Sequence, residues 1–401
     1  MNCQRIVLRR LRLPLIEPFV TAYGTESEKD VIIVEAVMES GAVGYAECAA
    51  GHAPLYTEET SGTAWHMLSE FLIPALIGGA IESVADLAAI RSTLERFRGN
   101  RMAKAAIEMA LWDGFAQESG IPLASLLGAS RTEIPVGVSV GIQTSTAVLV
   151  QKVRGLLEQG FARVKVKIRP GYDMEPLAAL RDAFPDMALM ADANSAYRLA
   201  DAAHLQRLDE FNLMMIEQPF AVDDLIDHAC LQKALKTPVC LDETIRCAED
   251  VRRAARLGSC RIVNLKVGRV GGFGEALRVH EACVAEGLDL WCGGMLETGI
   301  GRLHNIALTA LSGFTLPGDT APSERYFSED VIDPPVCFAR PGWLAVEPLA
   351  GVGSRVRPER LERWTVAKKH FDRQSAVAGA AGTGVARAGT ESSPLTRYAR
   401  Y

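Results

Sequence analysis

The spacing of apolar positions changes about one third of the way along the chain. Up to residue 130, alternating apolar and polar residues predict an antiparallel meander, with strands at Ile6–Pro14, Asp30–Met38 and Tyr45–Cys48, a first loop at Glu17–Gly24 and a turn at Gly41–Gly44. Helical spacing follows at about 58–76, 83–97 and 101–118. Strands followed by helices are typical of an α+β domain, which we expect over residues 1–130.

From Ile134 onward, short apolar runs alternate with helical segments. The strands are expected at Pro135–Val140, Val164–Ile168, Ala188–Asp192, Leu213–Glu217, Val239–Asp242, Ile262–Lys266, Leu288–Cys292 and Phe314–Pro317. The helices between them are expected at about 146–159, 175–184, 200–209, 223–236, 247–257, 273–286 and 299–311. The pattern predicts an α/β barrel, a modified TIM barrel of the type (β/α)₇β, over residues 131–320. A doubly wound open sheet is the alternative, but it needs a phosphate-binding glycine fingerprint after the first strand, which we do not find.

The last part of the chain is irregular. Prolines and glycines interrupt it, as in Asp333-Pro-Pro and Arg340-Pro-Gly-Trp343. We expect residues 321–367 to return and pack on the N-terminal domain. Residues 374–401 are rich in Ala, Gly, Ser and Thr and lack the large apolar side chains that a core needs, so we expect a disordered tail.

A charged residue stands near the end of five consecutive predicted strands. Lys167, Asp192, Glu217, Asp242 and Lys266 follow one another at about 25 residues, which is the length of one strand, one helix and two loops. In a parallel βα barrel all carboxyl ends of the strands lie on one face. The five side chains are therefore expected to converge on one site.

The three carboxylates of this series suit a metal ion. Oxygen ligands from Asp192, Glu217 and Asp242 favour a hard divalent cation such as Mg²⁺ or Mn²⁺. Without a cation, the clustered charges would repel one another and raise their pKa values. Unrelated strand-end acids paired with Arg or Lys are the alternative.

The lysines suit proton transfer. Lys165 and Lys167 lie two residues apart on one strand and therefore point to the same side, and Lys266 lies three strands further on. A substrate held by the metal would lie between Lys167 and Lys266. Burial beside a divalent cation and another ammonium group is expected to lower a lysine pKa toward neutrality, as a general base requires. Lysines that only bind the neighbouring acids remain the alternative.

Composition narrows the class of protein. A net charge of −6 without basic blocks argues against nucleic-acid binding, and no apolar run approaches the length of a membrane span. Nine single cysteines without a CxxC pair indicate free thiols in a reducing compartment. The start of the chain does not resemble a signal peptide. We expect a cytoplasmic enzyme with a small carboxylate substrate and no membrane or nucleic-acid partner, acting as a homo-oligomer.

These residues together resemble the enolase superfamily. Its muconate-lactonizing-enzyme subgroup has KxK on the second barrel strand, Asp/Glu/Asp on the third to fifth and Lys on the sixth, and the resemblance covers roughly residues 1–365. Within the subgroup, six local motifs look like the o-succinylbenzoate synthase and N-acylamino acid (N-succinylamino acid) racemase family. They are Asp192-Ala-Asn-Ser-Ala-Tyr197, Ile216-Glu-Gln-Pro219, Cys240-Leu-Asp-Glu243, Gly268-Arg-Val-Gly-Gly272, Trp291-Cys-Gly-Gly-Met-Leu-Glu-Thr-Gly299 and Leu316-Pro-Gly-Asp-Thr320.

The resemblance implies roles for individual residues. Lys167 and Lys266 would be the acid/base pair, with Lys165 as an electrostatic helper, and the three acids would ligate Mg²⁺. Glu243 would lie in or near the metal shell, as would Asn194. The expected substrate contacts are Asn194, Ser139, Gly293, Gly294, Met295, Phe19, Tyr56 and Arg269, of which Phe19 and Tyr56 belong to two loops of the capping domain.

The resemblance also implies a reaction. Either the chain dehydrates 2-succinyl-6-hydroxy-2,4-cyclohexadiene-1-carboxylate in menaquinone biosynthesis, or it racemises N-acylamino acids, or it does both. It lacks the strand-seven histidine of mandelate-racemase-like members and the strand-eight Asp-x-Asp of dipeptide epimerases. Another muconate-lactonizing-type activity, such as a cycloisomerase or dipeptide epimerase, is the alternative. A Schiff-base lysine aldolase and a non-catalytic binding barrel are more remote.

Overall fold

The structure is a computed structural model that describes residues 2–22, 24–77 and 79–373. Within these residues the N-terminal part contains an antiparallel sheet of four strands, in the order β13-β1-β2-β3. β1 (Cys3–Val20) and β2 (Thr25–Met38) form a long hairpin, and β3 (Val43–Cys48) pairs with β2. The strands run further than predicted, so Phe19 lies at the end of β1 and not on a loop.

Helices cover one side of this sheet. They are α1 (Ser61–Met67), the π-helix η1 (Leu68–Leu72), α2 (Ile73–Leu76), α3 (Val84–Glu95), α4 (Arg101–Ser119) and α5 (Leu123–Leu126). The sequence predicts one helix over 58–76, but the structure divides it. Pro74 has no N–H to donate to the preceding turn, and the wider π turn comes just before it. α4 packs closely on β3, because a Cβ at Gly44 would lie 2.1 Å from the carbonyl oxygen of Ala110.

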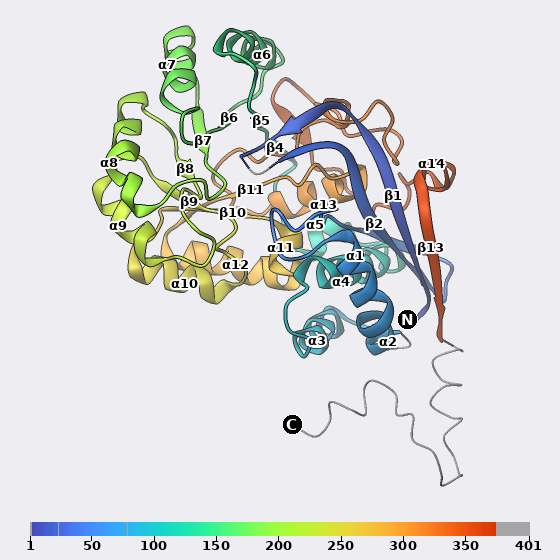
Figure 1. Ribbon diagram of the computed structural model, residues 1–401. Helices are drawn as coiled ribbons and strands as arrows, with labels where there is room; N and C mark the ends of the chain where they lie inside the picture. The colour runs from blue at the N-terminus through green and yellow to red at the C-terminus, as the bar shows by residue number, and fades with distance from the viewer. Residues whose placement is uncertain (1, 23, 78, 374–401) are drawn as a thin grey trace.

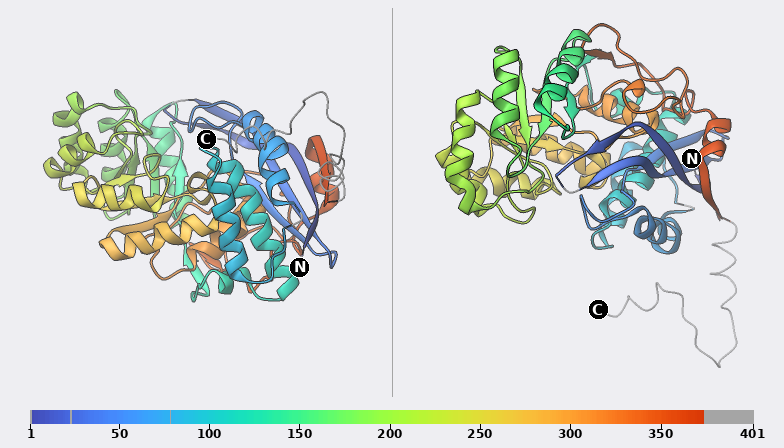
Figure 2. Two further views of the ribbon diagram at one scale, coloured as in Figure 1. Left: turned by 90° about the horizontal axis from the view of Figure 1, so that it is seen from below. Right: turned by 45° about the horizontal axis from the view of Figure 1, so that its top comes forward.

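The parallel sheet of the described residues has seven strands, in the order β11-β10-β9-β8-β7-β6-β5. They are β5 (Val138–Val140), β6 (Val164–Lys167), β7 (Leu189–Asp192), β8 (Ile216–Glu217), β9 (Val239–Leu241), β10 (Ile262–Leu265) and β11 (Asp289–Cys292). Helices that follow β5 to β10 form the outer layer on the left of Figure 1, and Figure 2 shows the same layer from below. They are α6 (Thr146–Glu158), α7 (Met174–Ala183), α9 (Ile226–Ala234), α10 (Ala248–Leu257) and α12 (Phe273–Glu286). The helix after β11, α13 (Gly299–Thr309), is buried and lies at the centre of Figure 1, beside α5. The predicted modified barrel is confirmed.

Two barrel elements differ from the prediction. Phe314–Pro317 is not a strand, because Pro317 lacks an N–H and the backbone N–H groups of Thr315 and Leu316 both donate to the carbonyl oxygen of Leu290. The segment still closes the barrel, since Gly137 N donates to Gly318 O at 2.7 Å on the other side. The helix predicted at 200–209 consists of η2 (Leu199–Asp201), α8 (Ala202–Leu205) and η3 (Gln206–Phe211), which are 3₁₀, α and 3₁₀ turns.

The chain then returns to the N-terminal sheet. After the 3₁₀ turn η4 (Ser323–Arg325), β12 (Trp343–Ala345) pairs with β4 (Glu133–Pro135), and α14 (Pro358–Trp364) leads into β13 (Thr365–Asp372). β13 pairs with β1, and Figure 1 shows it in red beside the blue hairpin. The four domain boundaries given above stay predictions, and the tail at 374–401 lies outside the described residues. None of the described helices combines the length and apolar character that a membrane span requires.

Candidate active site

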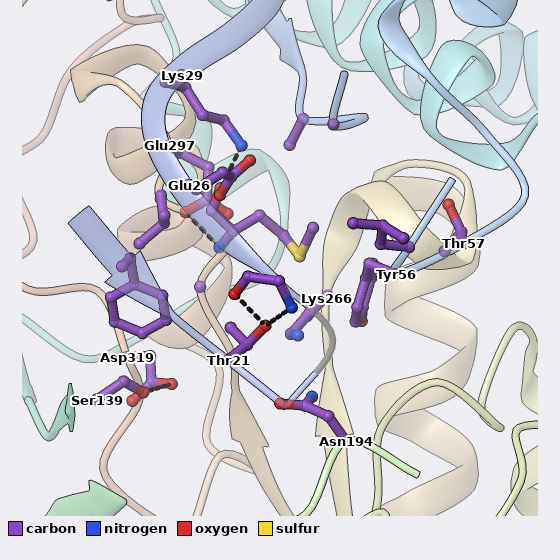
Figure 3. Close-up of a pocket in the computed structure, with 18 of the residues that line it drawn as sticks. Thr21, Glu26, Lys29, Tyr56, Thr57, Ser139, Asn194, Lys266, Glu297 and Asp319 are labelled. Carbon is purple, nitrogen blue, oxygen red and sulfur yellow. Dashed lines mark hydrogen bonds between the residues drawn. The ribbon is translucent and has the colours of Figure 1, made fainter. Parts of the chain in front are cut away.

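A cavity lies where the carboxyl ends of the barrel strands face the β1–β2 hairpin and the loop at 49–59. Figure 3 shows residues of its wall, which come from both parts of the fold. The barrel contributes Lys165, Lys167, Asn194 and Lys266 to this wall, and the loop contributes Tyr56. The lysines that the sequence places at strand ends thus meet the capping domain at this cavity, whereas Asp192, Glu217 and Asp242 are not among its lining residues.

Strand register brings the charged residues together. Lys167 on β6 pairs with Asp192 on β7, and Asp192 pairs with Glu217 on β8, so three of them lie side by side. Asp242 follows the last residue of β9, and Lys266 follows the last residue of β10. All five are buried. The common end of the parallel strands therefore explains the convergence that the 25-residue spacing predicts.

Each lysine contacts one or more of the acids. Lys167 Nζ lies 2.6 Å from Asp192 Oδ2, and Lys266 Nζ lies 2.8 Å from Asp242 Oδ2. Lys165 Nζ lies 3.0 Å from Glu217 and 3.3 Å from Asp192. Asp192, Glu217 and Asp242 thus form a row of acids, called the acid row below. The ammonium groups of the three lysines contact its carboxylates and neutralise them.

Further groups fix two of the lysines. Lys165 Nζ lies 2.9 Å from Asp319 and 4.8 Å from the ring centre of Trp291. Lys266 Nζ lies 4.3 Å from the ring centre of Tyr56, whose hydroxyl donates to Asp242 Oδ1 at 3.0 Å. Both ammonium groups are therefore held by an acid and an aromatic face.

The acids influence one another through space. Burial, followed by the charge of Asp192, raises the pKa of Glu217 to about 8. Burial also acts to raise the pKa of Asp192, but Lys167 and Lys165 outweigh it and lower that pKa. The burial of Glu243, with the charge of Asp242 beside it, raises its pKa to about 7. Burial and the neighbouring negative charges thus disfavour the charged forms of Glu217 and Glu243.

The contacts with the acids raise the pKa values of Lys165 and Lys266. Burial acts to lower the pKa of Lys266, yet the charge of Asp242 outweighs it, and the pKa is raised well above its ordinary value. The same balance, with Asp319 as the largest charge, raises the pKa of Lys165. Both pKa values are raised because each of these ammonium groups contacts a carboxylate directly, and a lowering beside a bound divalent cation stays a prediction.

The acid row fits a divalent cation by its chemistry. Its ligand atoms are all carboxylate oxygens from three neighbouring strand ends, which is the ligand type that a hard divalent cation prefers. Glu243 Oε2 is buried and has no hydrogen-bond partner in the described part of the chain. Within that part, no three His, Cys, Asp or Glu side chains already stand together as a metal cluster. The lysines occupy the positions at which a cation would compete for Asp192, Glu217 and Asp242.

Several expected contact residues line the cavity, namely Phe19, Tyr56, Ser139, Asn194, Gly294 and Met295. Asn194 also bridges two site residues, because its Oδ1 accepts from Lys167 at 2.7 Å and its Nδ2 donates to Glu243 at 3.1 Å. Ser139 donates to Asp319 Oδ2 at 2.8 Å. Ser139 and Asp319 thus form a polar edge beside Lys165.

Two expected substrate contacts have another place in the structure. Arg269 is 2% exposed and lies beneath the cavity wall, where it contacts Asp242 and donates to the Tyr56 hydroxyl at 2.8 Å. It positions these groups and does not face the cavity. Gly293 is needed for packing, since a Cβ there would lie 2.6 Å from Cε of Lys266.

Two charged residues of the capping domain, Lys29 and Glu47, line or support the cavity, and the sequence did not point to them. Lys29 Nζ donates to the carbonyl oxygen of Met295 at 2.6 Å, and Glu297 accepts from the Met295 N–H at 2.8 Å. Glu47 accepts from the N–H and hydroxyl of Thr298 at 2.9 and 2.6 Å. Lys29 and Glu47 therefore hold the loop that follows β11. Their strand patterns alone resemble those of solvent-exposed edges, which is why sequence reasoning missed them.

Comparisons with known proteins agree with this arrangement. Residues 148–360 match the "Enolase C-terminal domain-like" family, and residues 5–128 match the "Mandelate racemase / muconate lactonizing enzyme, N-terminal domain" family. An o-succinylbenzoate synthase of Geobacillus kaustophilus is 50% identical over 93% of this chain and 98% of its own length. An N-succinylamino acid racemase of Amycolatopsis sp is 44% identical over 92% and 99%. A solved enolase superfamily member from Listeria innocua superposes with a TM-score of 0.89 at 43% identity, over 93% of this chain and all of that one.

Proposed function

The chain belongs to the enolase superfamily, with the N-terminal domain of its mandelate racemase / muconate lactonizing enzyme members, and on that basis we propose that it removes the proton α to a substrate carboxylate. The product is o-succinylbenzoate, the opposite hand of an N-succinylamino acid, or both. The observation that supports this proposal best is the placement of Lys167 and Lys266 on two strand ends of one cavity, each beside an acid of the central row. Relatives named for each activity are similar to the chain over nearly its whole length.

We propose that Asp192, Glu217 and Asp242 hold a divalent cation, and that this cation is Mg²⁺. When bound, the cation supplies positive charge beside the substrate carboxylate and competes with the lysines for these acids. Lys167 takes the α-proton onto its Nζ, and the electron pair of the broken C–H bond moves into the carboxylate. The ammonium groups of Lys165 and Lys266 stabilise the negative charge that develops there.

The two reactions differ only in the second step. In the synthase reaction, the electron pair returns to the ring and expels hydroxide. The hydroxide takes up the proton held on Lys167 Nζ and leaves as water, and the ring becomes aromatic. In the racemase reaction, Lys266 returns a proton to the opposite face of the same carbon. Lys167 and Lys266 are both buried, so bulk water is excluded from the reacting carbon that lies between them.

The surroundings of the enzyme are also part of the proposal. The substrate is a small carboxylate, with neither nucleic acid nor membrane as a partner, and the protein acts as a homo-oligomer in the cytoplasm. The modest net charge of −6 supports the absence of a nucleic-acid partner, and the scattered free thiols support a reducing compartment. Light scattering in solution measures the oligomeric state directly.

One preparation tests the proposal when it is assayed with Mg²⁺ on both kinds of substrate. Formation of o-succinylbenzoate from the cyclohexadiene substrate is followed by absorbance, and racemisation of N-succinylamino acids of both hands is followed by polarimetry. Exchange of the α-proton in D₂O is recorded in parallel. Lack of turnover and of exchange on both substrates, with Mg²⁺ or Mn²⁺ present, would refute the proposed function.

A further inference from the structure

The outer wall of the cavity contains a carboxylate, that of Glu26, which forms no ion pair within the described residues. Glu26 lies at the start of β2, lines the cavity and is half-buried. Figure 3 shows it above Lys266, near Lys29 and Glu297. Among the residues that the structure describes, Glu26 forms neither an ion pair nor a side-chain hydrogen bond, in contrast to the other acids of the wall.

The other charged groups of the outer wall already have partners. Glu297 accepts from Met295 N, Lys29 donates to Met295 O, Glu59 accepts from Met102 N and Ala103 N, and Arg302 donates to Glu297 O at 2.9 Å. These bonds hold loops and helix ends in place. Glu26 has no such structural task in the described part of the chain, so its charge is available to a ligand.

The surroundings of Glu26 make a cation its best partner. Its cross-strand neighbour is Phe19, and a Cβ at Gly51 would lie 3.9 Å from Glu26 Oε1, so the carboxylate lies between the hairpin and the loop at 49–59. A substrate that fills the cavity displaces water from this gap. A carboxylate that loses water without gaining a partner is penalised, whereas a cation on the substrate restores the lost interaction.

We propose that Glu26 selects N-succinylamino acids whose side chain bears a positive charge, namely arginine and lysine. The inference rests on the racemase form of the proposed function. The substrate carboxylate and the reacting carbon are held at the strand ends by Lys167 and Lys266, while Glu26 lies on the capping side of the same cavity. A long side chain that leaves the reacting carbon toward the cap brings its charged end to Glu26, and a short side chain does not reach it.

The test compares substrates that differ in side-chain charge but little in length. N-succinyl derivatives of L-arginine, L-lysine, L-methionine and L-glutamate are assayed with the Mg²⁺-loaded wild-type enzyme, Glu26→Gln and Glu26→Lys. Glu28→Gln is the matched control, because Glu28 lies two residues along the same strand, is exposed and lies 3.7 Å from Arg12. Thermal unfolding of each variant shows that the fold is kept.

We expect the wild type to prefer arginine and lysine to glutamate by about tenfold in kcat/KM. Glu26→Gln should lower kcat/KM for arginine and lysine about fivefold to tenfold, mainly through KM, and leave methionine within twofold. Glu26→Lys should favour glutamate, and Glu28→Gln should change nothing. High salt should reduce the preference for cationic side chains.

The outcomes separate this inference from the proposed function. Equal loss on all four substrates in Glu26→Gln, or a wild type that does not distinguish side-chain charge, overturns the role of Glu26 and leaves the racemase assignment intact. Absence of α-proton exchange in every N-succinylamino acid overturns the role of Glu26 together with the racemase form of the proposed function, and formation of o-succinylbenzoate then shows whether the synthase form stands. Turnover of methionine with the predicted loss on arginine supports both.

Discussion

The buried carboxyl group of Glu108 joins the capping domain to the barrel and makes the stability of the protein depend on pH. Glu108 lies on α4, is 1% exposed, and accepts from the N–H groups of Phe273 and Gly274 at 2.7 and 2.9 Å, at the first turn of α12. Trp112 Nε1 also donates to it at 3.1 Å. The fit is close, since a Cβ at Gly272 would lie 2.2 Å from Glu108 Oε2.

The size of the effect follows from the pKa. Burial, opposed by the N–H donors of Gly274 and Phe273, raises the pKa of Glu108 from 4.5 to about 7. The folded protein therefore holds this proton more tightly than the unfolded chain does. The stabilisation is fully present below about pH 4.5 and is lost as the pH rises through 7. The difference between the two pKa values corresponds to about 3 kcal/mol in the free energy of unfolding.

Glu108→Gln removes this titration and keeps one acceptor oxygen. The free energy of unfolding of the wild type minus that of the variant should fall by about 3 kcal/mol between pH 4.5 and pH 8. Urea unfolding at half-unit pH intervals measures both proteins, and Glu158→Gln, an exposed position on α6, is the matched control with a flat difference. A difference that stays constant across this range for Glu108→Gln would refute the reasoning.

Three further predictions concern the site. Lys167→Ala and Lys266→Ala should each lower racemisation at least about 100-fold. One hand of the substrate should still exchange its α-proton in D₂O. Exchange of both hands in either variant would argue against two opposed bases. Dialysis against a chelator should abolish exchange and Mg²⁺ should restore it, whereas activity that survives metal removal would exclude the proposed cation. Lys29→Met should lower the free energy of unfolding by about 1–3 kcal/mol, because the carbonyl oxygen of Met295 loses a charged donor. The same change should raise KM more than it lowers kcat. Unchanged urea unfolding and an unchanged KM would contradict this role.

The sequence predicts the reacting end of the site well for a topological reason. In a parallel βα barrel the carboxyl ends of all strands lie on one face. A residue near the end of one strand therefore lies near the corresponding residue of the neighbouring strand, whatever the rest of the sequence is. Lys167, Asp192 and Glu217 demonstrate this, since they are register partners in the structure. The confirmed barrel and the confirmed family both depend on that regular spacing.

The sequence does not predict side chains whose place depends on packing between segments distant in the chain. Arg269 lies three residues after Lys266, a position from which it was expected to contact the substrate. The single helical turn α11 (Val267–Val270) instead places its side chain under the cavity, in contact with Asp242. Gly293 is read as a flexible contact, but it makes room for Lys266. Lys29 contacts a loop 266 residues away. A pattern of neighbouring residues in the sequence does not show which distant segment each of these side chains contacts.

The way the two domains are joined explains how one chemistry can accept different substrates. Glu47 and Glu108 are buried acids of the capping domain that accept from backbone N–H groups at the starts of α13 and α12, which are barrel helices. Such bonds are directional and hold the cap in one orientation over the strand ends. Glu26 lies on the hairpin at the rim, where it supports no helix end. A change at Glu47 or Glu108 should therefore affect stability and all substrates together, whereas a change at Glu26 should affect the choice of substrate alone.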